Sequence, residues 1–212
     1  MTAEGALRDE ICRIGASLYA RGYTVGSAGN ISARLDDGYL MTPTDACLGA
    51  LHPDGLTKLS TSGERLEGPA PSKTFALHRG VYECNGAVNG VVHTHSRHLV
   101  ALTLAGVWRP GDVVPPLTPY YVMKVGHIPL VPYYRPGDPA VAALAREYAA
   151  SVRGVLIERL GPVVWESSVS QAAYALEELE ETARLWLATG RTPEPLDEAA
   201  LDELRATFGA RW

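Results

Sequence analysis

The sequence predicts an α/β fold built on a mixed, mostly antiparallel sheet flanked by helices. Helical and strand-like segments alternate along its 212 residues, which is typical of this class. The expected strands are short and bounded by proline and glycine, which favours a mixed or antiparallel sheet over a purely parallel one. The length is enough to bury one core, so we expect a single domain over residues 1–212.

The first third of the chain predicts two helices and the first strands. Apolar residues at helical spacing predict a helix over 6–21. A glycine-rich stretch, 26–35, leads into a strand over 39–44, and the polar segment 45–70 is expected to form loops and short strands. Ser72 is a good N-cap, so we expect the second helix to begin there.

The middle of the chain predicts one buried strand and one helix. The run AVNGVVHTH, 87–95, is short and mostly apolar, as in a buried strand. A helix is expected over 97–106, and the proline- and glycine-rich stretch 107–119 predicts a loop. Residues 126–134 are expected to form a short extended piece.

The last third predicts two strands and three helices. They are a helix from Asp138 to residue 152, a strand, turn and strand over 154–165, a long helix over 169–189, and a short helix over 196–207. Asp138 supplies an N-cap, and the proline after it suits the first helical position. Ser168 and Gln171 form a capping box at the start of the long helix.

Composition excludes several classes of protein without indicating a function. The net charge is −5 and lysine and arginine do not cluster, which argues against a nucleic-acid partner. No apolar run reaches about 18 residues and no signal-peptide pattern is present, so we expect no membrane span and a cytoplasmic location. Three cysteines without a CxxC pair predict neither a disulfide framework nor a structural zinc site.

His93 and His95 are the sharpest local signal for chemistry. Residues two apart on a strand face the same side, so both imidazoles can share a divalent metal such as zinc. On spacing alone, two hydrogen-bonded histidines without a metal are the better interpretation, because a catalytic zinc site normally has three protein ligands.

A second signal is the segment Pro71-Ser72-Lys73-Thr74, which precedes an expected helix. Free N–H groups of a first helical turn, a serine and a cation together make an anion site. Lysine occurs only at 58, 73 and 124, so Lys73 stands out. Taken alone, Ser72 as a simple cap and Lys73 as a solvated side chain are the better interpretation of the pattern. Asn30, after a glycine-rich turn, offers a further amide to a phosphate.

Taken in order along the chain, these patterns resemble the class II aldolase/adducin family. The motifs that carry the resemblance are GSAGNIS, TPT, the PSK helix start, VVHTHS, TPYYVM, VPYYRPGD, LGPVV and a helix with ALEELEETARL. Within the family, the sequence resembles the branch of 3-oxo-tetronate 4-phosphate decarboxylases, which are related to fuculose-phosphate aldolases. The resemblance covers residues 8–190 and leaves a C-terminal helical tail over 191–212.

The resemblance implies a three-layer fold, a homotetramer with sites near subunit interfaces, and a small-molecule substrate. It implies a lyase in which a divalent metal, zinc above all, is held by three histidines and stabilises an enediolate. His93 and His95 fall on two of the metal-ligand positions, and Tyr120 falls on a tyrosine that lines the pocket. The phosphate-contact positions fall on Asn30, Thr44, Ser72 and Lys73.

Three positions depart from the family pattern. The third metal-ligand position, directly before Gly-Pro, is Leu160. The acid/base glutamate position is Thr74, which has no useful pKa near neutrality. A glycine of the phosphate loop is Asp45, whose carboxylate would repel a phosphate. We therefore expect an altered site with Lys73, Thr74 and Tyr120 at the catalytic positions and Asp45 among the substrate-binding residues.

Several residues are candidates to replace the missing ligand. Glu158 is expected to share a strand face with Leu160, and His98, His127 and Asp45 are further candidates. We prefer ordinary polar roles for Glu158 and His98. Asp45 is harder to dismiss, because the resemblance places its loop at the pocket.

The sequence leaves three functions open. One is a carbon–carbon lyase of class II aldolase type that acts through an enediolate on a small oxo- or hydroxy-acid or sugar-acid derivative. Another is an enzyme of the same fold with metal-independent chemistry on an unphosphorylated substrate. The third is a catalytically inactive binding or partner protein. Anion binding is the first role expected of Lys73, and a role as base or amine nucleophile is the alternative.

Overall fold

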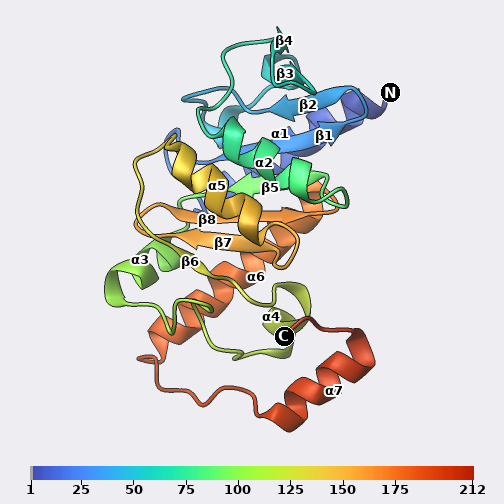
Figure 1. The fold of residues 1–212 in the computed structure, drawn as a ribbon. Coiled ribbons are helices and arrows are strands. Elements are labelled where there is room, and N and C mark those ends of the chain that lie inside the picture. Colours follow the sequence, from blue (N-terminus) through green and yellow to red (C-terminus); the bar gives the residue numbers. More distant parts are fainter. Residues whose placement is uncertain (1) are drawn as a thin grey trace.

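The computed structural model describes residues 2–212, which form one eight-stranded sheet with helices on both faces (Figure 1). The strand order is β4-β3-β2-β1-β5-β8-β7-β6, and every neighbouring pair is antiparallel except β6 with β7. The predicted mixed, mostly antiparallel sheet is therefore confirmed. The strands are β1 (Asn30–Leu35), β2 (Gly38–Met41), β3 (Thr57–Ser60), β4 (Arg65–Glu67), β5 (Gly90–His93), β6 (Leu130–Val131), β7 (Gly154–Ile157) and β8 (Gly161–Glu166).

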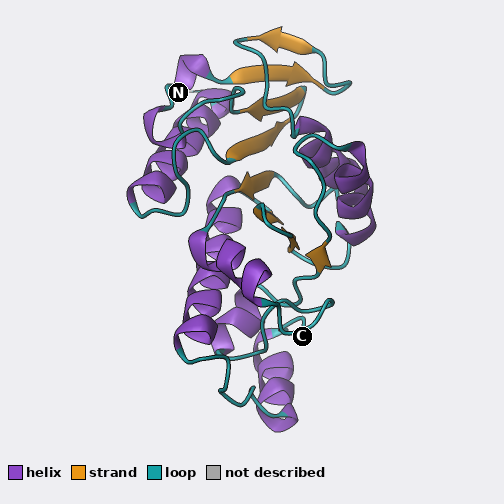
Figure 2. Cartoon of the chain, turned by 90° about the vertical axis from the view of Figure 1, so that its left-hand side faces the viewer, coloured by secondary structure: helices purple, strands orange, loops and turns teal. Residues whose placement is uncertain are grey.

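Helices cover the two faces of the sheet in separate groups (Figure 2). The helices are α1 (Ala3–Ala20), α2 (Phe75–Cys84), α3 (Arg97–Ala105), α4 (Pro119–Lys124), α5 (Pro139–Tyr148), α6 (Val169–Ala188) and α7 (Glu198–Phe208). One hydrophobic cluster joins α1, α3 and α6 to one face, and a second joins α2 and α5 to the other. Because residues alternate between the faces of a strand, β2, β5, β7 and β8 each contribute buried side chains to both clusters. Among residues 2–212, no helix is both long enough and apolar enough to cross a membrane.

Most expected elements are present within a few residues of their predicted bounds. The predicted caps of α5 and α6 are confirmed, because Asp138 accepts a hydrogen bond from the Ala140 N–H at 3.0 Å and Ser168 accepts one from the Gln171 N–H at 3.1 Å. These signals are local, so they survive tertiary packing.

Two expectations about elements were wrong, and one helix was missed. Helix α2 begins at Phe75 with Thr74 in the N-cap position, so Ser72 is not the cap. The expected strand over 87–95 is shorter, and β5 ends at His93, which leaves His95 beyond it. Helix α4 follows the proline-rich loop and was not predicted. It is only six residues long, too short to show a helical period.

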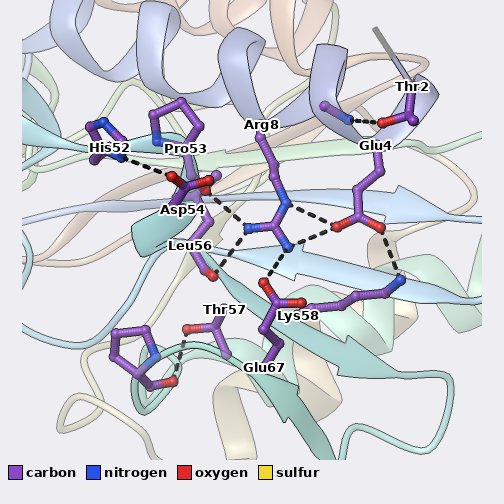
Figure 3. Close-up of polar contacts among 12 residues, drawn as sticks. Thr2, Glu4, Arg8, His52, Pro53, Asp54, Leu56, Thr57, Lys58 and Glu67 are labelled. Carbon is purple, nitrogen blue, oxygen red and sulfur yellow. Dashed lines mark hydrogen bonds and ion pairs between the residues drawn. The ribbon is translucent and has the colours of Figure 1, made fainter.

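An ion-pair network around Arg8 connects α1 to strands β3 and β4 at the edge of the sheet (Figure 3). The Arg8 guanidinium donates to Glu4 at 2.7 Å, to Glu67 of β4 at 3.3 Å and to the Pro53 carbonyl at 3.0 Å. Lys58 of β3 donates to the other oxygen of Glu4 at 2.9 Å. These contacts offset the cost of burying an arginine, which is 8% exposed.

Replacing Arg8 with methionine is expected to lower the free energy of unfolding by about 2 kcal/mol, because the Pro53 carbonyl and two carboxylates lose their donor. Lys58 and then Arg8 lower the pKa of Glu4 below its ordinary 4.5. Glu4 therefore stabilises the fold above that value, and its contribution is lost as the pH falls through the lower, folded-state pKa. Urea unfolding at pH 7 and at acid pH measures both effects, with the exposed Arg13→Met on the same helix as control. Equal stability of the two variants would contradict this prediction.

Candidate active site

Eight predicted site residues line one cavity of about 230 Å³, which we call the outer pocket. They are Asn30, Thr44, Asp45, Ser72, Lys73, Thr74, His93 and His95. Leu160, the predicted third-ligand position, also lines it. Antiparallel pairing of β1 with β5 places Asn30 directly opposite His93, so two motifs far apart in the sequence meet at one edge of the pocket.

The two histidines lie side by side, with ring centroids 5.1 Å apart. The buried His93 donates from Nδ1 to the Pro162 carbonyl at 2.8 Å, which leaves the lone pair on Nε2. Burial, with His95 adding to the effect, lowers the pKa of His93 to about 4, and burial also lowers the pKa of His95. Both rings are therefore neutral near pH 7 and able to bind a metal or accept a hydrogen bond.

The described residues do not fit the three-histidine metal centre that the resemblance implies. Leu160 supplies no donor atom, and residues 2–212 contain no group of three histidine, cysteine, aspartate or glutamate side chains placed to hold one metal ion. Two imidazoles from this chain fall one short of the usual catalytic zinc site. Any metal at His93 and His95 needs ligands from outside this set.

Three of the four candidate replacement ligands have other partners. Glu158 lies in the turn after β7, not on a strand, so its expected shared face with Leu160 is wrong; it accepts from the Tyr133 N–H at 3.3 Å. His98 contacts Glu180 at 2.9 Å, and His127 contacts Asp112 at 2.5 Å. Of the four candidates, Asp45 is the one that lines the outer pocket.

The anion-binding corner of the outer pocket lies just before α2. Ser72 and Thr74 hydrogen-bond each other through their hydroxyls at 3.1 Å, and Lys73 between them is exposed to solvent. Asn30 is 5% exposed, and its Oδ1 has no partner. Because amide oxygen and nitrogen are assigned from contacts, this end of Asn30 can serve a ligand as donor or acceptor.

Asp45 adopts a strained backbone conformation in this corner. Its φ is 57°, in the left-handed region that favours glycine. The strain and the carboxylate both set this loop apart from an ordinary phosphate-binding loop, in which backbone N–H groups approach the anion. Asp45 therefore changes the charge of a site that otherwise carries Lys73.

Tyr120 does not reach the outer pocket within this chain. It lies on α4, is 63% exposed and lines a different cavity, of about 590 Å³, together with Tyr174 and Phe208. Its predicted role at the pocket requires a neighbouring copy of the chain.

Sequence reasoning missed His78, which lines a second cavity together with His93. His78 is fully buried; its Nδ1 lies 2.8 Å from Ser32 Oγ, which lies 2.8 Å from the Tyr82 hydroxyl. Its Nε2 has no partner. Burial, and next the ring of His93, lowers the pKa of His78 to about 3, so the ring is neutral. The available signal was its position four residues after Thr74 on the same helix face.

Known proteins resemble this chain over most of its length. It is 68% identical to the 3-oxo-tetronate 4-phosphate decarboxylase of Cupriavidus necator over the whole of both chains. It is 44% identical to the enzyme of the same name from Escherichia coli K12, covering 96% of this chain and 97% of the relative.

Solved structures agree on the fold. The crystal structure of YgbL from Escherichia coli superposes with a TM-score of 0.92 at 44% identity, covering 96% of this chain and 100% of that one. An L-fuculose 1-phosphate aldolase shares the fold with a TM-score of 0.83 at 18% identity, covering 99% of this chain and 98% of that one. The family described as class II aldolase and adducin N-terminal domain matches residues 9–187. This chain belongs to the class II aldolase and adducin family.

Proposed function

We propose that this protein is a carbon–carbon lyase that decarboxylates a phosphorylated 3-oxo sugar acid of the 3-oxo-tetronate 4-phosphate type. The observation that carries the proposal is the 68% identity over the whole of both chains to an enzyme of that name. The outer pocket supports it, because Lys73, Ser72 and Asn30 offer a phosphate a cation, a hydroxyl and an amide beside the histidine pair.

The reaction places defined demands on these residues. In a 3-oxo acid, the bond between C1 and C2 breaks, CO₂ leaves, and the electron pair passes through C2 to the C3 oxygen as an enediolate. Protonation at C2 then gives a three-carbon ketose phosphate. Lys73 anchors the phosphate, while His95, half-buried beside His93, is positioned to hydrogen-bond the enediolate oxygen. A divalent metal, zinc above all, stays a proposal, because this chain offers it only His93 and His95.

Release of CO₂ from 3-oxo-tetronate 4-phosphate tests the proposal. We expect turnover of the phosphorylated acid and far slower turnover of the same acid without phosphate. The double variant His93→Ala/His95→Ala, which lacks the histidine pair and is expected to be inactive, controls for the spontaneous decarboxylation of a 3-oxo acid. A rate equal to this control with both substrates would overturn the proposed function.

A second candidate function is favoured by the joint presence of Thr74, Leu160 and Asp45 in one pocket. An enzyme that acts on an unphosphorylated acid without a metal, or a binding partner without activity, needs neither a third ligand nor a phosphate loop. Preferential turnover of the unphosphorylated acid would favour the former, and binding without turnover the latter.

The homotetramer also stays a proposal, in which Tyr120 would meet the outer pocket of a neighbouring copy.

Replacing Asp45 with glycine is expected to tighten phosphate binding about tenfold, because a like charge leaves the site and glycine lets the backbone approach the anion. The inhibition constant of inorganic phosphate measures this. Asp45→Asn is the matched control, since asparagine tolerates this conformation and removes only the charge. Unchanged inhibition in both variants would show that Asp45 does not face the bound anion.

A further inference from the structure

A second cavity, the inner chamber, continues from the outer pocket. It has a volume of about 90 Å³ and shares five lining residues with the outer pocket: Lys73, Thr74, His93, Pro136 and Leu160. Its own walls are largely apolar, from Leu77 of α2, Val141 of α5, Ile157 of β7 and Val163 of β8. The inner chamber thus leads from His93 into the space between the sheet and helices α2 and α5.

The charged groups at the inner chamber neutralise each other. Arg135 and Asp138, which both line it, form an ion pair at 3.6 Å. The remaining polar group of note is the buried ring of His78, which is neutral. Apart from Lys73 at the shared opening, the inner chamber therefore offers a ligand no unpaired charge.

The hydrogen bonds of Ser32 and Tyr82 favour one position for the ring proton of His78. The Tyr82 hydroxyl uses its proton by donating to Ser32 Oγ, and Ser32 then donates to His78 Nδ1. This arrangement leaves the proton of the neutral imidazole on Nε2, the atom without a partner. The reverse direction would leave the Tyr82 proton unused as well, which is costly in a buried site. His78 therefore contributes a neutral ring to the wall of the inner chamber, with Nε2 buried.

We infer that the inner chamber receives the carboxyl group of the substrate as it leaves as CO₂. This inference rests on the proposed function. The C1–C2 bond breaks, its electron pair stays with C2 and the C3 oxygen, and the two oxygens of C1 leave with it as neutral CO₂. No oxidant, reductant or co-reactant is needed.

The physical reason is the difference between the carboxylate and CO₂. An apolar, neutral chamber solvates a carboxylate poorly and accepts neutral CO₂. As the charge moves from C1 toward the enediolate oxygen near His93 and His95, the chamber favours the transition state over the ground state. The volume suffices for three heavy atoms, since one water needs roughly 10–15 Å³ of such space. A phosphate dianion suits the outer pocket instead, where Lys73 and the polar side chains lie.

A chamber-filling variant tests the inference. Ala142 lines the inner chamber on α5, and the adjacent Ala143 is exposed, so Ala142→Leu and Ala143→Leu add the same atoms in different places. We expect Ala142→Leu to lower kcat about 100-fold, as for a misplaced reacting group, and Ala143→Leu to leave it unchanged. Binding of the three-carbon product phosphate, which has no carboxyl group, should be equal in both. Ala76→Leu, from the α2 side, is a second filling variant should Ala142→Leu not fold.

Crystals pressurised with CO₂ test the same site without turnover. We expect density for CO₂ in the inner chamber of the wild type and none in Ala142→Leu. An empty wild-type chamber, or equal kcat for the filling and control variants, would overturn the inference while leaving the proposed function intact. Loss of product binding in Ala142→Leu would overturn it too, because the chamber would then hold the phosphate end. Wild-type protein that binds CO₂ but releases none from the substrate would refute the proposed function, and the inference with it.

Discussion

The double variant Thr74→Glu/Leu160→His is expected to bind about one zinc ion per chain and to decarboxylate 3-oxo-tetronate 4-phosphate roughly 100- to 10,000-fold faster than the wild type. Both positions line the outer pocket with His93 and His95, so the new carboxylate and imidazole would enter the same space. A third imidazole completes a zinc site, and a carboxylate supplies the acid/base group that threonine cannot.

The two single variants separate these contributions. Leu160→His alone is expected to restore zinc binding, measured as metal content after purification without chelator, with little gain in rate. Thr74→Glu alone should leave the metal content low, as in the wild type. A double variant that stays free of zinc after incubation with it would show that the pocket has been remodelled beyond these two positions.

Lys73→Met is expected to weaken binding of the phosphorylated substrate about 10- to 100-fold, seen as a rise in KM. The lost charge-assisted hydrogen bond contributes about 1.5–3 kcal/mol. Lys73→Arg should recover most of the affinity, because it keeps the cation. Lys124→Met, on α4 beside the other large cavity, is the matched control.

The ratio of kcat to KM effects decides between two roles of Lys73. An anion-binding lysine changes KM more than kcat, and its effect weakens at high salt. A lysine that acts as base or nucleophile would lose kcat, and arginine would not rescue it. Unchanged KM in Lys73→Met would contradict the anion-binding role.

Local signals in the sequence predicted most of the elements. Asp138 and Ser168 accept hydrogen bonds from the first turn of their own helices, so both caps could be predicted without knowing the fold. The prediction that Ser72 caps α2 was wrong because Thr74, two residues later, also suits an N-cap. Only the path of the chain decides which of the two occupies that position. The short α4 carried too few residues for a period to appear.

The candidate site was predicted in part. The motifs identified the residues of the outer pocket, and the three departures, Thr74, Leu160 and Asp45, were visible as residues out of pattern. The partners of His98 and His127 could not be predicted from the sequence, because Glu180 and Asp112 lie on other segments. Tyr120 lies in one of the family motifs, but the motif does not reveal that α4 places it away from the outer pocket of its own chain.

The sequence by itself determined the fold class, the family and the composition of the outer pocket, because periodicity, caps and ordered motifs are properties of neighbouring residues. Only the tertiary structure decided that Asn30 faces His93 across two paired strands, that Glu158 lies in a turn, and that His78 is buried with an unused Nε2. Strand register and the packing of α2 and α5 against the sheet join residues far apart in the chain. The inner chamber follows from that packing, and no local pattern encodes it.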